Sequence, residues 1–187
     1  MHTLKVILLV VLVIIAIPLV IALFVKKEYL VERNVTINKP KQEVFNYLKF
    51  LKNQDNFNKW VKTDPNMKKD FRGTDGTVGF VYAWDGNSKA GKGEQEIKQL
   101  QDGEKVDVEI RFEKPFASIA STPFTTTSVS PTQTKVTWAM KGKSKYPINF
   151  MNLFMDKLLG SDIDSSLLML KGVLEKPVTV SGNINGK

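Results

Sequence analysis

Apolar and charged residues alternate strictly between Glu104 and Phe112, where every second side chain is apolar: Val106, Val108, Ile110 and Phe112. Such alternation is typical of a β-strand with one dry face and one wet face. The preceding Asp102-Gly103 predicts a tight hairpin turn, because the central residues of such turns need positive φ. Folding the chain at this turn places Ile97 opposite Val108.

The same register can be checked on the wet face of the predicted hairpin. Opposite charges then face each other in two pairs, Glu94 with Arg111 and Lys98 with Asp107. The like-charged pair Glu96 and Glu109 has Lys98 and Arg111 diagonally near. A slip of one residue would reverse both faces, so the hairpin predicts a curved antiparallel sheet with a concave apolar face.

The rest of the chain is predicted to form strands and helices separated by turn residues. Strands are predicted over Tyr29–Ile37, Met67–Arg72, Thr77–Trp84, Lys92–Gln101, Ala117–Ser130 and Thr134–Lys143. Pro123 interrupts the fifth of these, which suggests an edge strand or a bulge. A helix is predicted from an Asn38 N-cap to about Lys52, followed by a second short helix before Trp60.

A long C-terminal helix is predicted from Pro147. Apolar residues recur there at spacings of three or four: Met151, Met155, Leu159, Ile163, Leu167, Leu170 and Leu174. Gly160 suggests a bend in this helix. The order of one strand, two helices, about six strands and one long helix predicts an α+β domain in which the last helix covers the concave face.

Before this domain, Val6–Val25 is an uninterrupted run of twenty uncharged, almost entirely apolar residues. In helical form it spans about 30 Å, the thickness of a bilayer core. We interpret it as an uncleaved membrane anchor. A cleaved signal peptide is the alternative, but the run is long for one and no small-residue cleavage site follows. Lys26, Lys27 and Arg33 outweigh Lys5, which favours a cytoplasmic domain by a narrow margin.

These boundaries give a transmembrane helix at 4–26, a folded domain at 28–176 and a loose polar tail at 177–187. The net charge of +8 is concentrated close to the apolar run, since 26–69 carries +6 and 70–187 only +1. This basic segment suits either anionic headgroups or simple solvation. Nucleic-acid binding is disfavoured because the excess is modest and tethered to a bilayer.

The composition also limits the chemistry. The chain has no cysteine, and its single histidine, His2, precedes the apolar run. The predicted domain therefore lacks a thiolate nucleophile, the usual general base and the commonest metal ligand. We predict no cofactor and no metal site.

Several short motifs carry a resemblance to a known family: Asn38–Phe45, Trp60, Gly76–Gly79, Trp84–Gly86, Gly91–Glu94 and Thr134–Trp138. Across 29–176 the chain resembles the SRPBCC superfamily, and more narrowly its bacterial polyketide cyclase/dehydrase-like proteins, some of which carry an N-terminal membrane helix. The resemblance implies a helix-grip fold, START-like or birch-pollen-allergen-like: a seven-stranded antiparallel sheet around a long C-terminal helix. It also implies a deep cavity for lipids, sterols, polyketides or other apolar ligands.

The predicted ligand-binding residues lie on the dry sheet face and the apolar helix stripe: Trp60, Phe80, Tyr82, Trp84, Gln95, Ile97, Ile110, Phe112, Trp138, Met151, Met155 and Leu159. For any single aromatic residue, filling the core is the favoured interpretation, whereas the aromatic residues as a set favour a cavity. The register also sets the amides of Gln95 and Gln99 into this apolar face. They are more informative, because such amides need partners: a ligand, an internal hydrogen bond or, near the end of the sheet, water.

Three functions follow as alternatives. The leading interpretation is a membrane-anchored module that binds a hydrophobic small molecule or lipid between the sheet and the C-terminal helix. The second is an enzyme of the cyclase or hydrolase type that uses Tyr82, Gln95 or a buried carboxylate. The third is an interaction domain whose core is filled. The space between helix and sheet discriminates among them.

Overall fold

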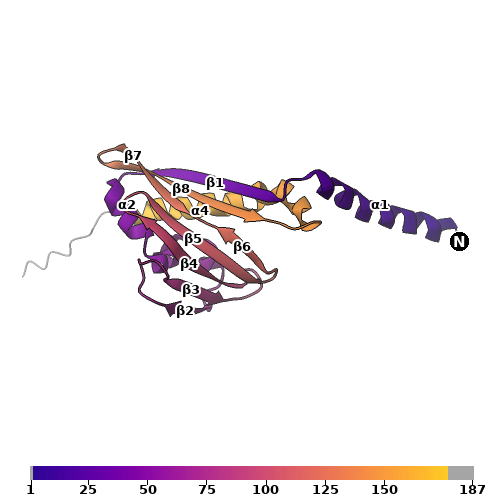
Figure 1. The fold of residues 1–187 in the computed structure, drawn as a ribbon, viewed down its shortest axis with the longest axis horizontal. Coiled ribbons are helices and arrows are strands. Elements are labelled where there is room, and N and C mark those ends of the chain that lie inside the picture. The colour runs from indigo at the N-terminus through magenta and orange to yellow at the C-terminus, as the bar shows by residue number, and fades with distance from the viewer. Residues whose placement is uncertain (1, 177–187) are drawn as a thin grey trace, which may run out of the picture.

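In the computed structural model, which describes residues 2–176, a long apolar helix leads into an α+β domain (Figure 1). The helix α1, His2–Phe24, projects away from the domain, and only Ala22 on it is buried. It is long and apolar enough to cross a membrane by length and composition. The predicted loose tail at 177–187 lies outside the described residues.

The domain is built on one antiparallel sheet. Its strands are β1 (Glu28–Ile37), β2 (Lys68–Arg72), β3 (Val81–Asp85), β4 (Lys92–Gln101), β5 (Lys105–Lys114), β6 (Ser118–Ser121), β7 (Phe124–Ser130) and β8 (Gln133–Lys143). The order across the sheet is β1-β8-β6-β5-β4-β3-β2, and β7 also pairs with β5 and β8. The predicted interruption at Pro123 therefore splits one internal strand into β6 and β7, rather than marking an edge.

Short helices connect β1 to β2, and a long one follows β8. The segments are α2 (Lys41–Leu48), η1 (Leu51–Asn53), α3 (Gln54–Phe57), η2 (Val61–Thr63), η3 (Ile148–Phe154) and α4 (Met155–Leu174), where η marks a 3-10 helix. Helix α4 packs against the inner face of β1, and α3 packs against α4. Figure 1 shows α4 lying along the sheet behind β1 and β8. The predicted α+β helix-grip architecture is confirmed.

The hairpin β4–β5 has the predicted register over most of its length. Ile97 pairs with Val108, and both side chains are buried on the inner face. A bulge at Lys98 then shifts the pairing, so that Gln99 lies opposite Asp107. The prediction that Gln99 lies on the apolar face is therefore wrong: the extra residue turns Gln99 to solvent and Leu100 inward.

Three further details differ from the sequence-based expectations. Pro40, not Asn38, precedes the first turn of α2, and the Asn38 N–H instead donates to Glu175 Oε1 at 2.6 Å. Strand β3 begins only at Val81, which leaves Val78 exposed in the preceding turn. The predicted helix from Pro147 begins as the 3-10 segment η3, and regular α-helix starts only at Met155.

Candidate functional site

The middle of the space between α4 and the sheet is filled by aromatic side chains. Trp138 of β8 stacks on Phe124 with ring centroids 4.6 Å apart and meets Phe57 of α3 edge-on. Its indole nitrogen donates to Thr122 Oγ1 at 2.7 Å, so the one polar atom of the ring is satisfied. Phe80 and Ile97 are also fully buried. These residues therefore act as the packed core of the domain.

Other predicted site residues keep part of their surface open at the margin of this core. They come from the loop after α3, from β3 and β5, and from α4: Trp60, Trp84, Ile110, Phe112, Met155 and Leu159. Trp84 meets Phe112 edge-on at 6.1 Å, and its indole nitrogen donates to the Ala90 carbonyl. Partly exposed aromatic rings held in place in this way form an apolar surface that a hydrophobic molecule can contact.

Hydrogen bonds on the neighbouring loop hold Trp60 against α4. The Lys59 N–H donates to Ser166 Oγ at 2.9 Å, and Lys59 Nζ contacts Asp162 at 2.6 Å. Trp60 then meets Trp138 edge-on at 5.9 Å. The open margin is thus continuous with the core between α4 and the sheet.

Gln95 lies on the inner face of β4, as its register predicts, and its amide is engaged within the protein. It exchanges hydrogen bonds with Gln54 of α3, at 3.1 Å and 3.3 Å. Asn58 donates to the same Gln54 oxygen at 2.8 Å. All three side chains are buried, so this amide cluster fastens α3 to the sheet. Of the two expected kinds of partner for Gln95, the described residues provide the internal one.

Tyr82, which the enzyme alternative names as a titratable group, has a buried side chain. Its hydroxyl donates to Asp55 Oδ1 at 2.8 Å, and Asp55 also contacts Lys69 at 2.8 Å. Burial, with a further contribution from Asp55, raises the pKa of Tyr82 well above its ordinary value. Tyr82 therefore stays protonated near neutral pH and holds α3 against β3.

Met151 lies apart from the other predicted site residues. It belongs to η3, where 41% of its surface is exposed. The change of helix type at Met155 turns it out of the stripe that the spacing predicts. Met151 instead lies on the segment that adjoins the end of α1.

Two open pockets lie outside the core. One pocket, of about 590 Å³, is lined by residues from the end of α1, from η3 and from the start of β1, with Phe24, Leu30 and Leu153 among them. The other, of about 760 Å³, lies where β6 joins β5 and β8, with Ile119 and Lys141 in its lining. Among residues 2–176, no cluster of three or more His, Cys, Asp or Glu side chains could hold a metal ion.

Sequence reasoning did not identify the partners that complete these contacts. Gln54, Asp55 and Asn58 lie in a polar run with Asn53 and Asn56, and nothing in the sequence separates the buried members from the exposed ones. Only the placement of α3 on the sheet decides which of them point inward.

The sheet, the short helical segments after β1 and the C-terminal helix define a class of protein, the helix-grip proteins. Solved structures of this class superpose on the chain, which confirms the predicted helix-grip fold. Their sequences are too distant to show more than the fold. No family model and no curated protein matches the chain.

Three of these structures illustrate the likeness. The Zhui aromatase/cyclase from Streptomyces sp. R1128 superposes with a TM-score of 0.61 at 12% identity, over 83% of this chain and 98% of its own. Norcoclaurine synthase from Thalictrum flavum, solved with dopamine and hydroxybenzaldehyde, gives 0.62 at 6% identity, over 80% and 89%. The di-domain ARO/CYC StfQ of steffimycin biosynthesis gives 0.59 at 10% identity, over 79% and 51%.

Proposed function

We propose that the protein is a membrane-anchored module that binds a hydrophobic small molecule or lipid at the open margin of its helix-grip core. The observation that carries this proposal is the set of partly exposed apolar side chains packed on the margin of the core, with Trp84 and Phe112 from the sheet and Leu159 from α4 among them. The structural neighbours point the same way, since norcoclaurine synthase was solved with two small aromatic molecules bound.

Anchoring by α1 is the second part of the proposal. A core helix of this composition would be buried, whereas α1 is exposed along nearly its whole length. We favour an uncleaved anchor over a signal peptide because its end is hydrogen-bonded to the folded domain. The excess of Lys26, Lys27 and Arg33 over Lys5 favours the cytoplasmic side. Labelling of a Ser88→Cys variant from outside intact cells would refute that orientation.

An enzymatic role has weaker support from the same residues. Tyr82 is protonated and bonded to Asp55, and the Gln95 amide is bonded to Gln54. The carboxylates of Glu94 and Glu96 on β4 lie on the outer face, in ion pairs with Arg111. The proposal is therefore binding without an assigned reaction.

The test compares two substitutions on opposite sides of α4. Leu159→Gln places an amide at the open margin, whereas Leu168→Gln makes the same change at a position that is 64% exposed. Native mass spectrometry of the full chain, released from detergent, is expected to find an apolar molecule bound to the wild type and to Leu168→Gln. We expect its occupancy to fall several-fold in Leu159→Gln, because the amide loses apolar contact with the ligand.

Two outcomes would contradict the proposal. One is a wild-type chain that carries no apolar molecule and takes none up when offered lipid or polyketide extracts. The other is equal occupancy in both variants, which would place the bound molecule elsewhere on the chain.

A further inference from the structure

Two asparagine side chains of η3 bind the end of α1. Asn149 Nδ2 donates to the carbonyls of Ala22 at 2.6 Å and Val25 at 2.9 Å. Asn152 Nδ2 donates to the carbonyls of Lys26 and Lys27 at 2.9 Å and 3.0 Å. The last carbonyls of a helix lack partners within the helix, and here η3 supplies one for Ala22 as well as for the carbonyls of the segment that follows α1. The position of η3 along the axis of α1 is therefore fixed.

That position places η3 beside the end of the apolar run, with Asn149 level with Ala22 and Asn152 level with Lys26 and Lys27. Ala22 comes three residues before Val25, the last residue of the run, which corresponds to about 4.5 Å along a helix axis. Both Asn149 and Ala22 are buried against each other. Interfacial segments typically sink about 5–10 Å into the boundary between headgroups and acyl chains. If α1 spans a bilayer, η3 thus lies at the depth of such a segment.

The outward surface of η3 suits that environment. Four large apolar side chains on this short segment are exposed by 41–60%: Ile148, Met151, Leu153 and Phe154. Phe24, on the last turn of α1, is also exposed, and together with Leu153 it lines the pocket between the two segments. We call these five residues the η3 surface. In water such a cluster is unfavourable, whereas at a lipid boundary it is stabilising.

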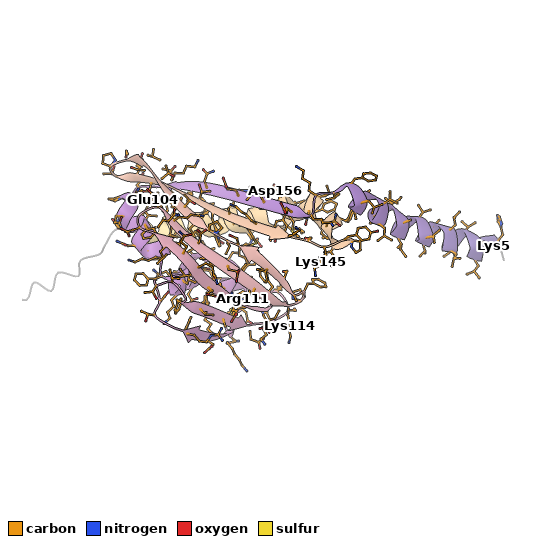
Figure 2. The ribbon with its side chains drawn as sticks, in the orientation of Figure 1. Lys5, Glu104, Arg111, Lys114, Lys145 and Asp156 are labelled. Atoms are coloured by element: carbon orange, nitrogen blue, oxygen red, sulfur yellow. The ribbon has the colours of Figure 1, made fainter. Side chains whose placement is uncertain are left out.

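Basic residues flank the η3 surface along the chain. Lys26 and Lys27 follow α1, Lys145 precedes η3, and Lys157 lies in the first turn of α4. Figure 2 shows Lys145 at the end of the domain from which α1 leaves, and Glu104 at the opposite end. Lysines beside an exposed apolar cluster match the anionic headgroups of a bilayer better than they match a neutral protein surface.

We infer that the η3 surface is a second membrane contact, which lies in the interface of an anionic bilayer and holds the domain down beside α1. The continuity of this surface with α1 and the lysines that flank it favour the bilayer over a protein partner. The inference rests on the proposed anchoring by α1. It adds that the domain is not free to tumble at the end of a tether, so that the open margin of the core stays close to the lipid.

The test uses the full chain in vesicles that contain phosphatidylglycerol. Because the natural sequence has no cysteine, single-cysteine variants can carry one environment-sensitive fluorophore each. Leu153→Cys and Met151→Cys probe the η3 surface, and Ser128→Cys on β7, exposed and far from α1 (Figure 1), is the control. We expect lipids with a shallow quencher to quench both η3 probes several-fold more strongly than the control, and iodide to show the reverse order.

Flotation of the same vesicles separates the two proposals. A chain that does not float with vesicles would refute the anchoring itself. A chain that floats while both η3 probes remain open to iodide would refute only the second contact. Probes shielded from lipid and iodide alike would indicate that a second copy of the chain covers the η3 surface, which also overturns the inference.

Discussion

Arg33 and Gly160 meet where β1 crosses α4. The Arg33 guanidinium lies between two carboxylates of the helix, with Nη1 2.8 Å from Asp156 Oδ1 and Nε 3.1 Å from Asp164 Oδ2. Its hydrogen bond to Asp156, together with its charge, lowers the pKa of that carboxyl. A Cβ on Gly160 would lie 2.8 Å from Arg33 Cζ, closer than side-chain atoms normally approach. The glycine thus makes room for Arg33, which explains a residue that the sequence suggested as a bend.

Gly160→Ala is therefore expected to behave unlike an ordinary glycine replacement in a helix. Such a change normally stabilises by about 1 kcal/mol. Here the methyl group displaces Arg33 from its carboxylates and cancels that gain. The same change in an Arg33→Ala background should recover it. Denaturant unfolding of the full chain in detergent, followed by tryptophan fluorescence, measures the free energy of unfolding.

Gly172 provides the matched control in the same helix, because a Cβ added there would have no neighbouring atom within 4 Å. Gly172→Ala should stabilise by about 1 kcal/mol with or without Arg33. An equal gain from Gly160→Ala in both backgrounds would show that the contact with Arg33 does not constrain the helix.

At the scale of elements, the β4–β5 hairpin shows what alternation can and cannot predict. Apolar and charged residues agree on one register from Gly93 to Ile97, and the structure has that register. The pattern fails at Lys98, where Leu100 breaks the alternation by following Ile97 at an interval of three. That interval is the sequence signal of the bulge, because an extra residue restores the inward position to Leu100.

The helical segments were harder to delimit for a physical reason. Spacings of four between Met151, Met155 and Leu159 fit one continuous helix, but η3 is held by hydrogen bonds from Asn149 and Asn152 to α1. Those contacts are tertiary, so they produce no periodic pattern in the sequence. The same holds for the pairing of Gln95 with Gln54, whose need for a partner was predictable but whose partner was not.

The outer face of this hairpin carries an ion network around Arg111, as the predicted register requires. Arg111 contacts Glu94 at 2.9 Å and Glu96 at 2.8 Å, and it also bonds to Glu109. The pKa of Glu94 is lowered mainly by Arg111, and that of Glu96 by Lys98 and Arg111. These carboxylates are more acidic in the folded chain than in the unfolded one.

The sign of the pH dependence follows from these lowered pKa values. Their stabilisation is complete above the ordinary glutamate value of 4.5 and is lost as the pH falls below it. Arg111→Gln should cost about 1 kcal/mol at neutral pH, since several partly exposed pairs are lost. It should also weaken the decline in stability between neutral pH and about pH 3, because carboxylates without Arg111 bind protons more readily.

Arg111→Lys is the matched control, because it keeps the charge but loses the forked donor geometry. It should retain more of the acid-dependent decline than Arg111→Gln. Unfolding curves across this pH range measure both effects. Identical pH profiles for wild type and Arg111→Gln would show that the network does not tune Glu94 and Glu96.

At the scale of the whole molecule, the sequence predicts α1 and the domain better than it predicts the contact between them, here called the joint. The apolar run at Val6–Val25 and the helix-grip domain both follow from patterns in the chain, and α1 and the sheet have the expected places (Figure 1). The joint depends on Asn149 and Asn152, two amides without any distinguishing pattern around them. Their side chains make the domain a continuation of α1 rather than a separate body on a tether.

Removal of the Asn149 and Asn152 hydrogen bonds is therefore expected to let the domain move relative to α1 without unfolding it. Asn149→Ala with Asn152→Ala removes these donors from the carbonyl of Ala22 in α1 and from those of Val25, Lys26 and Lys27 just after it. The cost is about 1–3 kcal/mol for each carbonyl that is left without a partner and that water cannot reach. Spin labels on Ile17→Cys in α1 and Ser121→Cys on β6 report the distance between helix and domain by pulsed electron resonance in vesicles. We expect a narrow distribution of distances in the parent chain and a broad one in the double variant.

The control is Asn56→Ala, which removes only a bond to the Tyr47 hydroxyl and should leave the distribution narrow. A distribution that is already broad with both asparagines present would mean that η3 does not fix the domain on α1, and the open margin of the core would then have no defined direction relative to the bilayer.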